Sequence, residues 1–217
     1  MQDLGVQDYA AARRAMVDGQ LRPEGVVDAR VVHAMAHVPR ENFVPAEARA
    51  LAYGDRPVPL GKGRALGSPV ATGRLLSELE PRQGERALVV GAGSGYGAAV
   101  LDSLGLEVTA IESDPDLASL AKAASPKIKL IVGDLAAGHP GGAPYDLILI
   151  DGAVDRIPDA ITAQLIEGGR IGAALIDRGV TRLAVGRNVG GRVGLRTIAD
   201  ADVAPLPGFE RPKAFIF

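Results

Sequence analysis

Residues 87–97 read Ala-Leu-Val-Val-Gly-Ala-Gly-Ser-Gly-Tyr-Gly, and this stretch decides the predicted fold. Its first four residues are a continuous apolar run, which predicts a buried β-strand. The glycines at 91, 93 and 95 allow a sharp turn and a close approach of a ligand to the main chain. Residues 96–103 then predict a helix. A strand, a glycine-rich turn and a helix in this order are typical of a ligand-binding α/β fold.

Strands and helices alternate along the rest of the chain. Four further apolar runs predict strands, at 107–111, 129–132, 145–150 and 170–175. Helices are predicted around 116–124 and 158–165. Fully apolar strands separated by helices indicate a mostly parallel sheet with helices on both faces. The runs at 183–189, 193–198 and 214–217 have no helices between them, so we expect them to form an antiparallel edge.

The first part of the chain has a different pattern. Helices are predicted over 9–21 and from Asp28, as N-cap, to Val38. Residues 53–66 contain too many glycines and prolines for a helix and predict a hairpin or an ordered loop. Ser68-Pro69 then predicts the start of another helix, with serine as N-cap and proline in the first turn.

The change of pattern lies near residues 79–81 and suggests a boundary. We expect an N-terminal segment of helices and a hairpin at 1–78, which borders the substrate site. Residues 79–217 are expected to form a Rossmann-like domain that binds the cofactor. A chain of 217 residues suits this organisation, one α/β domain with a modest addition.

Polar residues follow the predicted strands, where ligands of such sheets bind. Glu112 lies seventeen positions beyond Gly95 and can accept hydrogen bonds from ribose hydroxyls. Asp134, after the next strand, can accept one from an adenine amino group. Tyr96 replaces the last glycine of the dinucleotide fingerprint, so the loop fits a ligand without a pyrophosphate better than it fits NAD. Together with Glu112 and Asp134, it predicts S-adenosylmethionine as the ligand. The predicted cofactor-binding residues are Gly91, Ala92, Gly93, Gly95, Glu112, Ser113, Asp134 and Leu135. Asp151 ends the next strand, where a functional carboxylate and an exposed one are equally good interpretations.

Composition restricts the class of protein. Hydrophobic residues make up 47% of the chain and charged residues 23%, enough for a real core. The net charge is -2 and no long basic run occurs, which disfavours a nucleic-acid partner. Neither a signal peptide nor a membrane span is predicted, so we expect a cytoplasmic protein without a membrane partner. The oligomeric state is left open.

No metal site is predicted. The chain has no cysteine, which excludes thiolate ligands and disulfides. His33 and His37 have the i, i+4 spacing of a metal pair, but they lie opposite the apolar face of the predicted helix. We interpret them as part of a solvated face.

Several blocks of sequence carry a family resemblance over nearly the whole chain. They are residues 16–22, the Val-Pro-Arg-Glu-Asn-Phe-Val-Pro of 38–45, 52–61, 91–96 and 165–170. Together they resemble the protein-L-isoaspartate O-methyltransferases, and the blocks before residue 62 are more specific than the glycine-rich loop.

The resemblance implies an α/β fold with the Rossmann-like sheet of a class I methyltransferase. It implies S-adenosylmethionine as cofactor, a protein or peptide substrate, and methyl transfer to the carboxylate of damaged L-isoaspartyl residues, which starts their repair. A carboxylate is already ionised at pH 7, so this chemistry needs orientation rather than a strong general base.

One departure from the family pattern concerns the substrate side. The family pattern Gly-Gln-Thr-Ile-Ser-x-Pro corresponds to Gly63-Arg64-Ala65-Leu66-Gly67-Ser68-Pro69, so the family serine beside the reacting carboxylate falls on Gly67. Ser68, one place later, becomes the candidate catalytic residue. Arg64 could pair with a carboxylate or lie at the surface. The candidate substrate residues are Arg64, Leu66, Gly67, Ala204 and Pro205.

This departure leaves two alternatives open. A divergent family member could methylate a different acceptor with the same cofactor. A non-catalytic protein could bind S-adenosylmethionine as a structural ligand or a signal.

Overall fold

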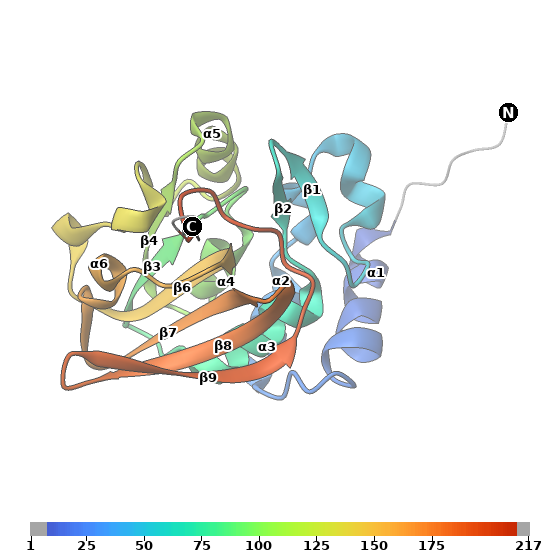
Figure 1. Cartoon of the computed structure of the whole chain (residues 1–217). Coiled ribbons are helices and arrows are strands. Elements are labelled where there is room, and N and C mark those ends of the chain that lie inside the picture. The colour runs from blue at the N-terminus through green and yellow to red at the C-terminus, as the bar shows by residue number, and fades with distance from the viewer. Residues whose placement is uncertain (1–7, 212–217) are drawn as a thin grey trace, which may run out of the picture.

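The main element of the fold is a seven-stranded sheet with the order β5-β4-β3-β6-β7-β8-β9 (Figure 1). A computed structural model describes residues 8–211. Neighbouring strands from β5 to β7 run parallel, whereas β7, β8 and β9 pair antiparallel. The strands are β3 (Arg86–Val90), β4 (Glu107–Glu112), β5 (Lys129–Val132), β6 (Tyr145–Val154), β7 (Leu165–Asp177), β8 (Val180–Val189) and β9 (Arg192–Asp200). The predicted α/β sheet with its antiparallel edge is therefore confirmed.

The central strand, β3, sets the position of the site. It pairs with β4 on one side and with β6 on the other. The chain thus passes to one side of β3 first and returns to the other side later, which makes β3 the point where the strand order switches. Ligands of open α/β sheets bind in the crevice at such a point, outside the carboxyl ends of the strands.

Helices and the N-terminal segment cover both faces of the sheet. The described helices are α1 (Tyr9–Met16), α2 (Ala29–His37), α3 (Pro69–Leu79), α4 (Tyr96–Ser103), α5 (Pro115–Ala124) and α6 (Asp159–Thr162). Alternate residues of β3 face different layers: Ala87 and Val89 pack with the side of α3 and α4, and Leu88 and Val90 with the side of α6. This alternation follows from the two-residue period of a strand.

The predicted caps of two helices are confirmed. The Asp28 carboxylate accepts a hydrogen bond from Arg30 N at the start of α2, over 2.9 Å. The Ser68 hydroxyl accepts one from Ala71 N at the start of α3, over 3.3 Å. Pro69 occupies the first turn of α3, where its missing N–H has no cost.

The glycine- and proline-rich stretch forms the predicted hairpin, with strands β1 (Val58–Gly61) and β2 (Arg64–Leu66). The hairpin lies beside α5 at the carboxyl ends of the parallel strands (Figure 1). Lys62, at its turn, forms ion pairs with Asp114 (2.8 Å) and Asp116 (2.7 Å) at the start of α5. These contacts place the N-terminal segment over the crevice.

Some predicted boundaries differ from the observed ones. The helix predicted over 9–21 continues past α1 as a π-helical turn, Val17–Leu21. The helix predicted at 158–165 is limited to α6, because Leu165 already pairs with Tyr145 at the start of β7. The strand predicted at 214–217 lies outside the described residues.

The division of the chain near residue 79 stays a prediction. Buried side chains of the first 78 residues and of the sheet belong to one contiguous cluster, which includes Met16, Met35, Leu76, Val89 and Leu147. The helices before the boundary and the sheet after it therefore share a core.

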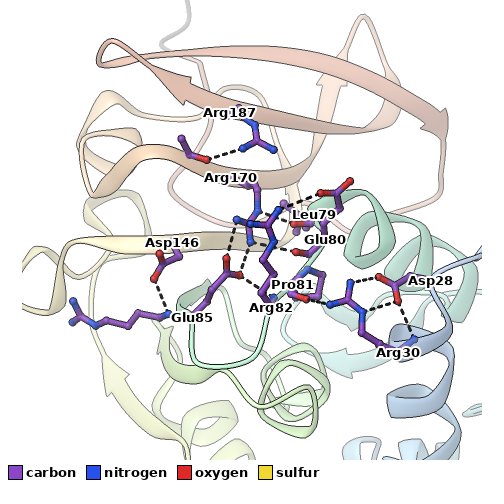
Figure 2. A network of polar contacts seen from close by, with 12 residues as sticks. Asp28, Arg30, Leu79, Glu80, Pro81, Arg82, Glu85, Asp146, Arg170 and Arg187 are labelled. Atoms are coloured by element: carbon purple, nitrogen blue, oxygen red, sulfur yellow. Dashed lines mark hydrogen bonds and ion pairs between the residues drawn. The ribbon is translucent and has the colours of Figure 1, made fainter.

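A network of polar contacts joins the C-terminal end of α3 to β7 (Figure 2). Arg170 on β7 is buried and donates to the Leu79 carbonyl over 2.9 Å and to the Glu85 carboxylate over 2.9 Å. Arg30 of α2 donates to the Pro81 carbonyl over 2.9 Å. Arg170 thus satisfies the carbonyl of the last residue of α3, which has no partner within the helix, and Arg30 binds the chain just after it.

Replacement of Arg170 by methionine should destabilise the fold. The change keeps the apolar stem but removes the ionic partner of Glu85, which keeps only the Arg82 N–H, and the side-chain donor of the Leu79 carbonyl. The expected cost is about 3 kcal/mol in the free energy of unfolding. Urea unfolding at pH 7 measures this cost. The matched control is Arg187→Met, because Arg187 is exposed and donates only to the Gly168 carbonyl. An equal loss in both variants would contradict the prediction.

Candidate active site

The glycine-rich turn after β3 is held against the end of β4. Gly91 N and Ala92 N both donate to the Ile111 carbonyl, over 2.9 and 3.1 Å. Gly91, Gly93 and Gly95 have φ values of 78°, 55° and 94°. Such backbone angles strain any residue with a Cβ, so the predicted requirement for glycine has a conformational cause here. Gly95 is the N-cap of α4, whose N-terminus therefore points into the site.

Glu112, at the end of β4, has its carboxylate fully buried beneath this turn. One oxygen accepts from Gly93 N over 2.7 Å. The other accepts from Ser113 N over 2.7 Å and from Asp114 N over 3.1 Å. The carboxylate therefore connects the glycine-rich turn to the turn after β4, which brings Gly93, Glu112 and Ser113 of the predicted cofactor set together.

Arg64 completes the surroundings of this carboxylate. Its Nη1 lies 2.6 Å from Glu112 Oε1, and its Nη2 donates to the Gly91 carbonyl over 3.1 Å. The side chain is 7% exposed, so the interpretation of Arg64 as a surface residue is wrong. Its carboxylate partner within the described chain is Glu112. The sequence pattern alone does not show this pair, because the two residues are 48 positions apart.

The charge state of Glu112 follows from these contacts. Burial raises the pKa of the carboxyl group. The hydrogen bond and the charge of Arg64, together with the backbone N–H donors, lower this pKa by a larger amount. The net pKa lies below the usual value, so Glu112 is an anion at neutral pH.

A second buried arginine holds the other wall of the site. Arg40 is fully buried, donates to the Ala52 carbonyl over 2.6 Å and to the Gly67 carbonyl, and stacks 4.8 Å above the Tyr96 ring. It thereby fixes the backbone at Gly67 against α4. Sequence reasoning missed this role, although Arg40 lies within the Val-Pro-Arg block that carries the resemblance.

Ser68, the candidate catalytic residue, has its hydroxyl engaged as the N-cap of α3. Its catalytic role stays a prediction, and the cap contact gives a structural reason for the serine that needs no catalysis. Leu66 is buried in β2. Gly67 and Asp151 both line one small pocket.

The remaining predicted site residues lie on neighbouring turns. Asp134 caps a short helical turn by accepting from Ala136 N over 2.9 Å, and Leu135 is buried next to it. Ala204 and Pro205 lie against the last residues of β6: Ala153 N donates to the Ala204 carbonyl over 2.9 Å, and Pro205 pairs with Ala153. Their roles toward cofactor and substrate stay predictions.

Asp151 lies in the carboxyl-terminal part of β6, next to the first turn of α4. Burial raises its pKa to about 6, with Glu112 adding to the effect and the charges of Arg64 and Arg40 opposing it. The carboxylate packs on the first turn of α4, because a Cβ added to Gly97 would lie 2.7 Å from Asp151 Oδ2. Asp151 is half-buried, so the interpretation of this residue as an exposed strand-end carboxylate is wrong.

Two features of the described chain bear on other ligands. Across residues 8–211, no group of three histidine or acidic side chains could hold a metal ion. His33 and His37 are exposed on α2, as predicted. Over the same residues, every helix is too short or too polar to cross a bilayer.

Comparison with known proteins identifies the family. Residues 12–185 match the model of the family described as protein-L-isoaspartate(D-aspartate) O-methyltransferase. The chain belongs to this family.

Two similar proteins have the name protein-L-isoaspartate O-methyltransferase. The Methylorubrum populi protein is 44% identical over 165 residues, which are 74% of this chain and 78% of that one. The Koribacter versatilis protein is 37% identical over 92% of both chains. The family match therefore extends to nearly full-length relatives.

Two solved structures share the fold. One, titled protein-L-isoaspartate O-methyltransferase, has a TM-score of 0.80 at 21% identity and matches 90% of this chain but only 66% of its own length. The other, a Plasmodium falciparum protein titled as a putative member in complex with S-adenosyl-L-homocysteine, has a TM-score of 0.77 at 19% identity over 89% and 97% of the two chains. The predicted class I methyltransferase fold is thus confirmed.

Stability should depend on the protonation of Asp151. Its folded pKa of about 6 lies above the unfolded value of about 3.9, so the folded state binds the proton more tightly. The free energy of unfolding should fall by about 2–3 kcal/mol as the pH rises from 4 to 6.5 and then level off. Urea unfolding of Asp151→Asn should lack this decline, whereas Asp159→Asn, at an exposed carboxylate, should keep it. A decline that survives in Asp151→Asn would assign it to another group.

Proposed function

We propose that this protein is an S-adenosylmethionine-dependent methyltransferase that methylates the free carboxylate of L-isoaspartyl residues in damaged proteins. The observation that carries the proposal is the buried Glu112 carboxylate, fixed beneath the glycine-rich turn in a chain that matches the family model over residues 12–185. The family names of the relatives support the acceptor, and they do not favour the alternatives of a different acceptor or a non-catalytic protein.

The residues present fit the cofactor. The turn has no side chain at Gly91 or Gly93, so a ligand can approach its main chain closely, and the Glu112 carboxylate lies beneath it. Glu112 would accept the ribose hydroxyls. Glu112 Oε2 accepts from Gly93 N, whereas Oε1 accepts from Arg64 and two backbone N–H groups, so Oε2 has acceptor capacity left for a hydroxyl.

The chemistry asks little of the protein beyond orientation. When bound, S-adenosylmethionine supplies a methyl group activated by its sulfonium. An isoaspartyl carboxylate is ionised at neutral pH, so this chain needs no general base to generate the nucleophile. The glycine-rich turn and the wall at Gly67, which Arg40 fixes, would hold the two reactants in line and exclude water.

The protein partner of this reaction would be any chain that carries an isoaspartyl residue. Methylation of that residue is the first step of its repair, so protein repair is the biological role that we infer. A cytoplasmic location remains a prediction from the sequence.

A methyl-transfer assay tests the proposed function. Purified protein with radiolabelled S-adenosylmethionine should label a peptide that contains L-isoaspartate and leave the same peptide with L-aspartate unlabelled, because the two differ in the position of the free carboxylate. Equal labelling of both peptides, or of neither, would refute the proposed acceptor.

Replacement of Glu112 by glutamine tests the cofactor site. Loss of the charged acceptor should weaken the binding of S-adenosylhomocysteine by about 10- to 100-fold, the range for a hydrogen bond to a charged group. Isothermal calorimetry measures the dissociation constant. The control is Glu107→Gln at the exposed opposite end of β4, which should bind like the wild type. Unchanged affinity in Glu112→Gln would remove Glu112 from the cofactor site, provided that the variant unfolds cooperatively on heating.

A further inference from the structure

A small pocket at the carboxyl end of β6 contains polar groups that the proposed function has not yet used. Its volume is about 20 Å³, room for about one water molecule. The lining is largely apolar and includes Leu75, Leu149, Ala174 and Val203. Against these walls, the polar side chains are Thr72 of α3 and Asp151 of β6. A mainly apolar pocket with a few convergent polar groups is typical of a specific binding site.

Thr72 places its hydroxyl next to Gly67. A Cβ added to Gly67 would lie 3.4 Å from Thr72 Oγ1, which is ordinary contact. The missing side chain at position 67 therefore leaves open the space that the Thr72 hydroxyl faces. This position is where the family pattern has its serine, so a hydroxyl is present on this side of the pocket in spite of Gly67.

Asp151 connects this pocket to the cofactor side. Its Oδ2 packs against Gly97 in the first turn of α4, directly after the glycine-rich turn. Three charged groups from other parts of the chain shift the pKa of Asp151. They are Arg40 in the segment before β1, Arg64 on β2 and Glu112 on β4. Asp151, which is half-buried, thus lies within electrostatic reach of the buried residues Arg40, Arg64 and Glu112, and the four residues form one charged cluster.

The charge of this cluster decides which acceptor it takes. With Asp151 ionised, the two arginines balance the two carboxylates of the chain, and the negative charge of Asp151 repels an acceptor carboxylate beside it. With Asp151 protonated, the cluster has one net positive charge, and the neutral carboxyl group gains an O–H donor. A carboxylate acceptor therefore favours the protonated form.

We propose that Thr72 and Asp151 select the acceptor: the Thr72 hydroxyl and the protonated Asp151 carboxyl group donate hydrogen bonds to the acceptor carboxylate, which binds together with one proton. The proposal rests on the proposed function and names the residues behind its specificity. The acceptor's other oxygen forms the bond to the methyl carbon, the carbon–sulfur bond breaks with its electron pair going to sulfur, and Asp151 keeps its proton. The raised pKa of Asp151 agrees with this assignment, because it keeps the group partly protonated near pH 6.

The pH dependence of KM tests the role of Asp151. The α-carboxylate of an isoaspartyl peptide is ionised from pH 5.5 to 8, so a change in KM over this range reports on the enzyme. The wild-type KM should rise about tenfold per pH unit above pH 6, with kcat little changed. In Asp151→Asn, whose amide keeps an N–H donor, KM should be independent of pH and about tenfold or more below the wild-type value at pH 8. Asp159→Asn should keep the wild-type slope.

The hydroxyl of Thr72 is tested with an isosteric change. Thr72→Val should raise KM about five- to tenfold at every pH without altering its slope, the effect expected for one lost hydrogen bond. Thr72→Ser should retain the wild-type KM. Addition of Gly67→Ser to Thr72→Val should restore most of the affinity, because a serine there projects toward the same space. The affinity for S-adenosylhomocysteine, measured by calorimetry, should be equal in all these variants.

Distinct results would overturn the two proposals. A wild-type slope in Asp151→Asn, or an unchanged KM in Thr72→Val, would refute the acceptor pocket while normal turnover leaves the proposed function intact. A loss of S-adenosylhomocysteine binding in parallel with the rise in KM would also refute it, because the residues would then act on the cofactor. Absence of isoaspartyl methylation by the wild type at every pH would refute the proposed function itself, and the pocket assignment with it.

Discussion

The buried ion pair between Arg64 and Glu112 is the interaction on which the rest of the site depends. A carboxylate at the end of a central strand is expensive to bury, and its cost is offset here by a guanidinium and by backbone N–H groups of two turns. Each donor comes from a different part of the chain: the β1–β2 hairpin, the turn after β3 and the turn after β4. The pair therefore holds the N-terminal segment over the crevice and, through Gly93, holds the glycine-rich turn in place.

The same constraint explains why the site is rich in buried charge. The buried charge of Arg64 acts on the charged groups near it. Arg64 and Arg40 lower the pKa of Asp151, which opposes the effect of burial. The net charge of such a group changes by one when a single proton is bound or released. At a protein surface, water would screen the effect of this change on a bound acceptor. The protein thus has an electrostatic means to discriminate anionic acceptors without a histidine or a metal in the described site.

Much of the framework was predictable because it depends on local patterns. The apolar runs of β3, β4 and β6 are largely buried on both faces, so their composition alone indicates parallel strands. The caps at Asp28 and Ser68 depend on residues a few positions away. The prediction was weakest where a tertiary contact overrides local preference: α6 is short because Leu165 has already joined β7.

By itself, the sequence determined the fold class, the glycine-rich turn, the candidate cofactor residues and the family resemblance. These depend on spacing within about twenty residues, which a single chain displays directly. Tertiary structure alone decided that Arg64 is buried on Glu112, that Arg40 supports Gly67, and that Thr72 and Asp151 share a pocket. Such pairings join residues tens of positions apart, and their energies depend on burial and on the surrounding charges. Burial and the surrounding charges are set only when the chain folds, so a local sequence pattern cannot predict them.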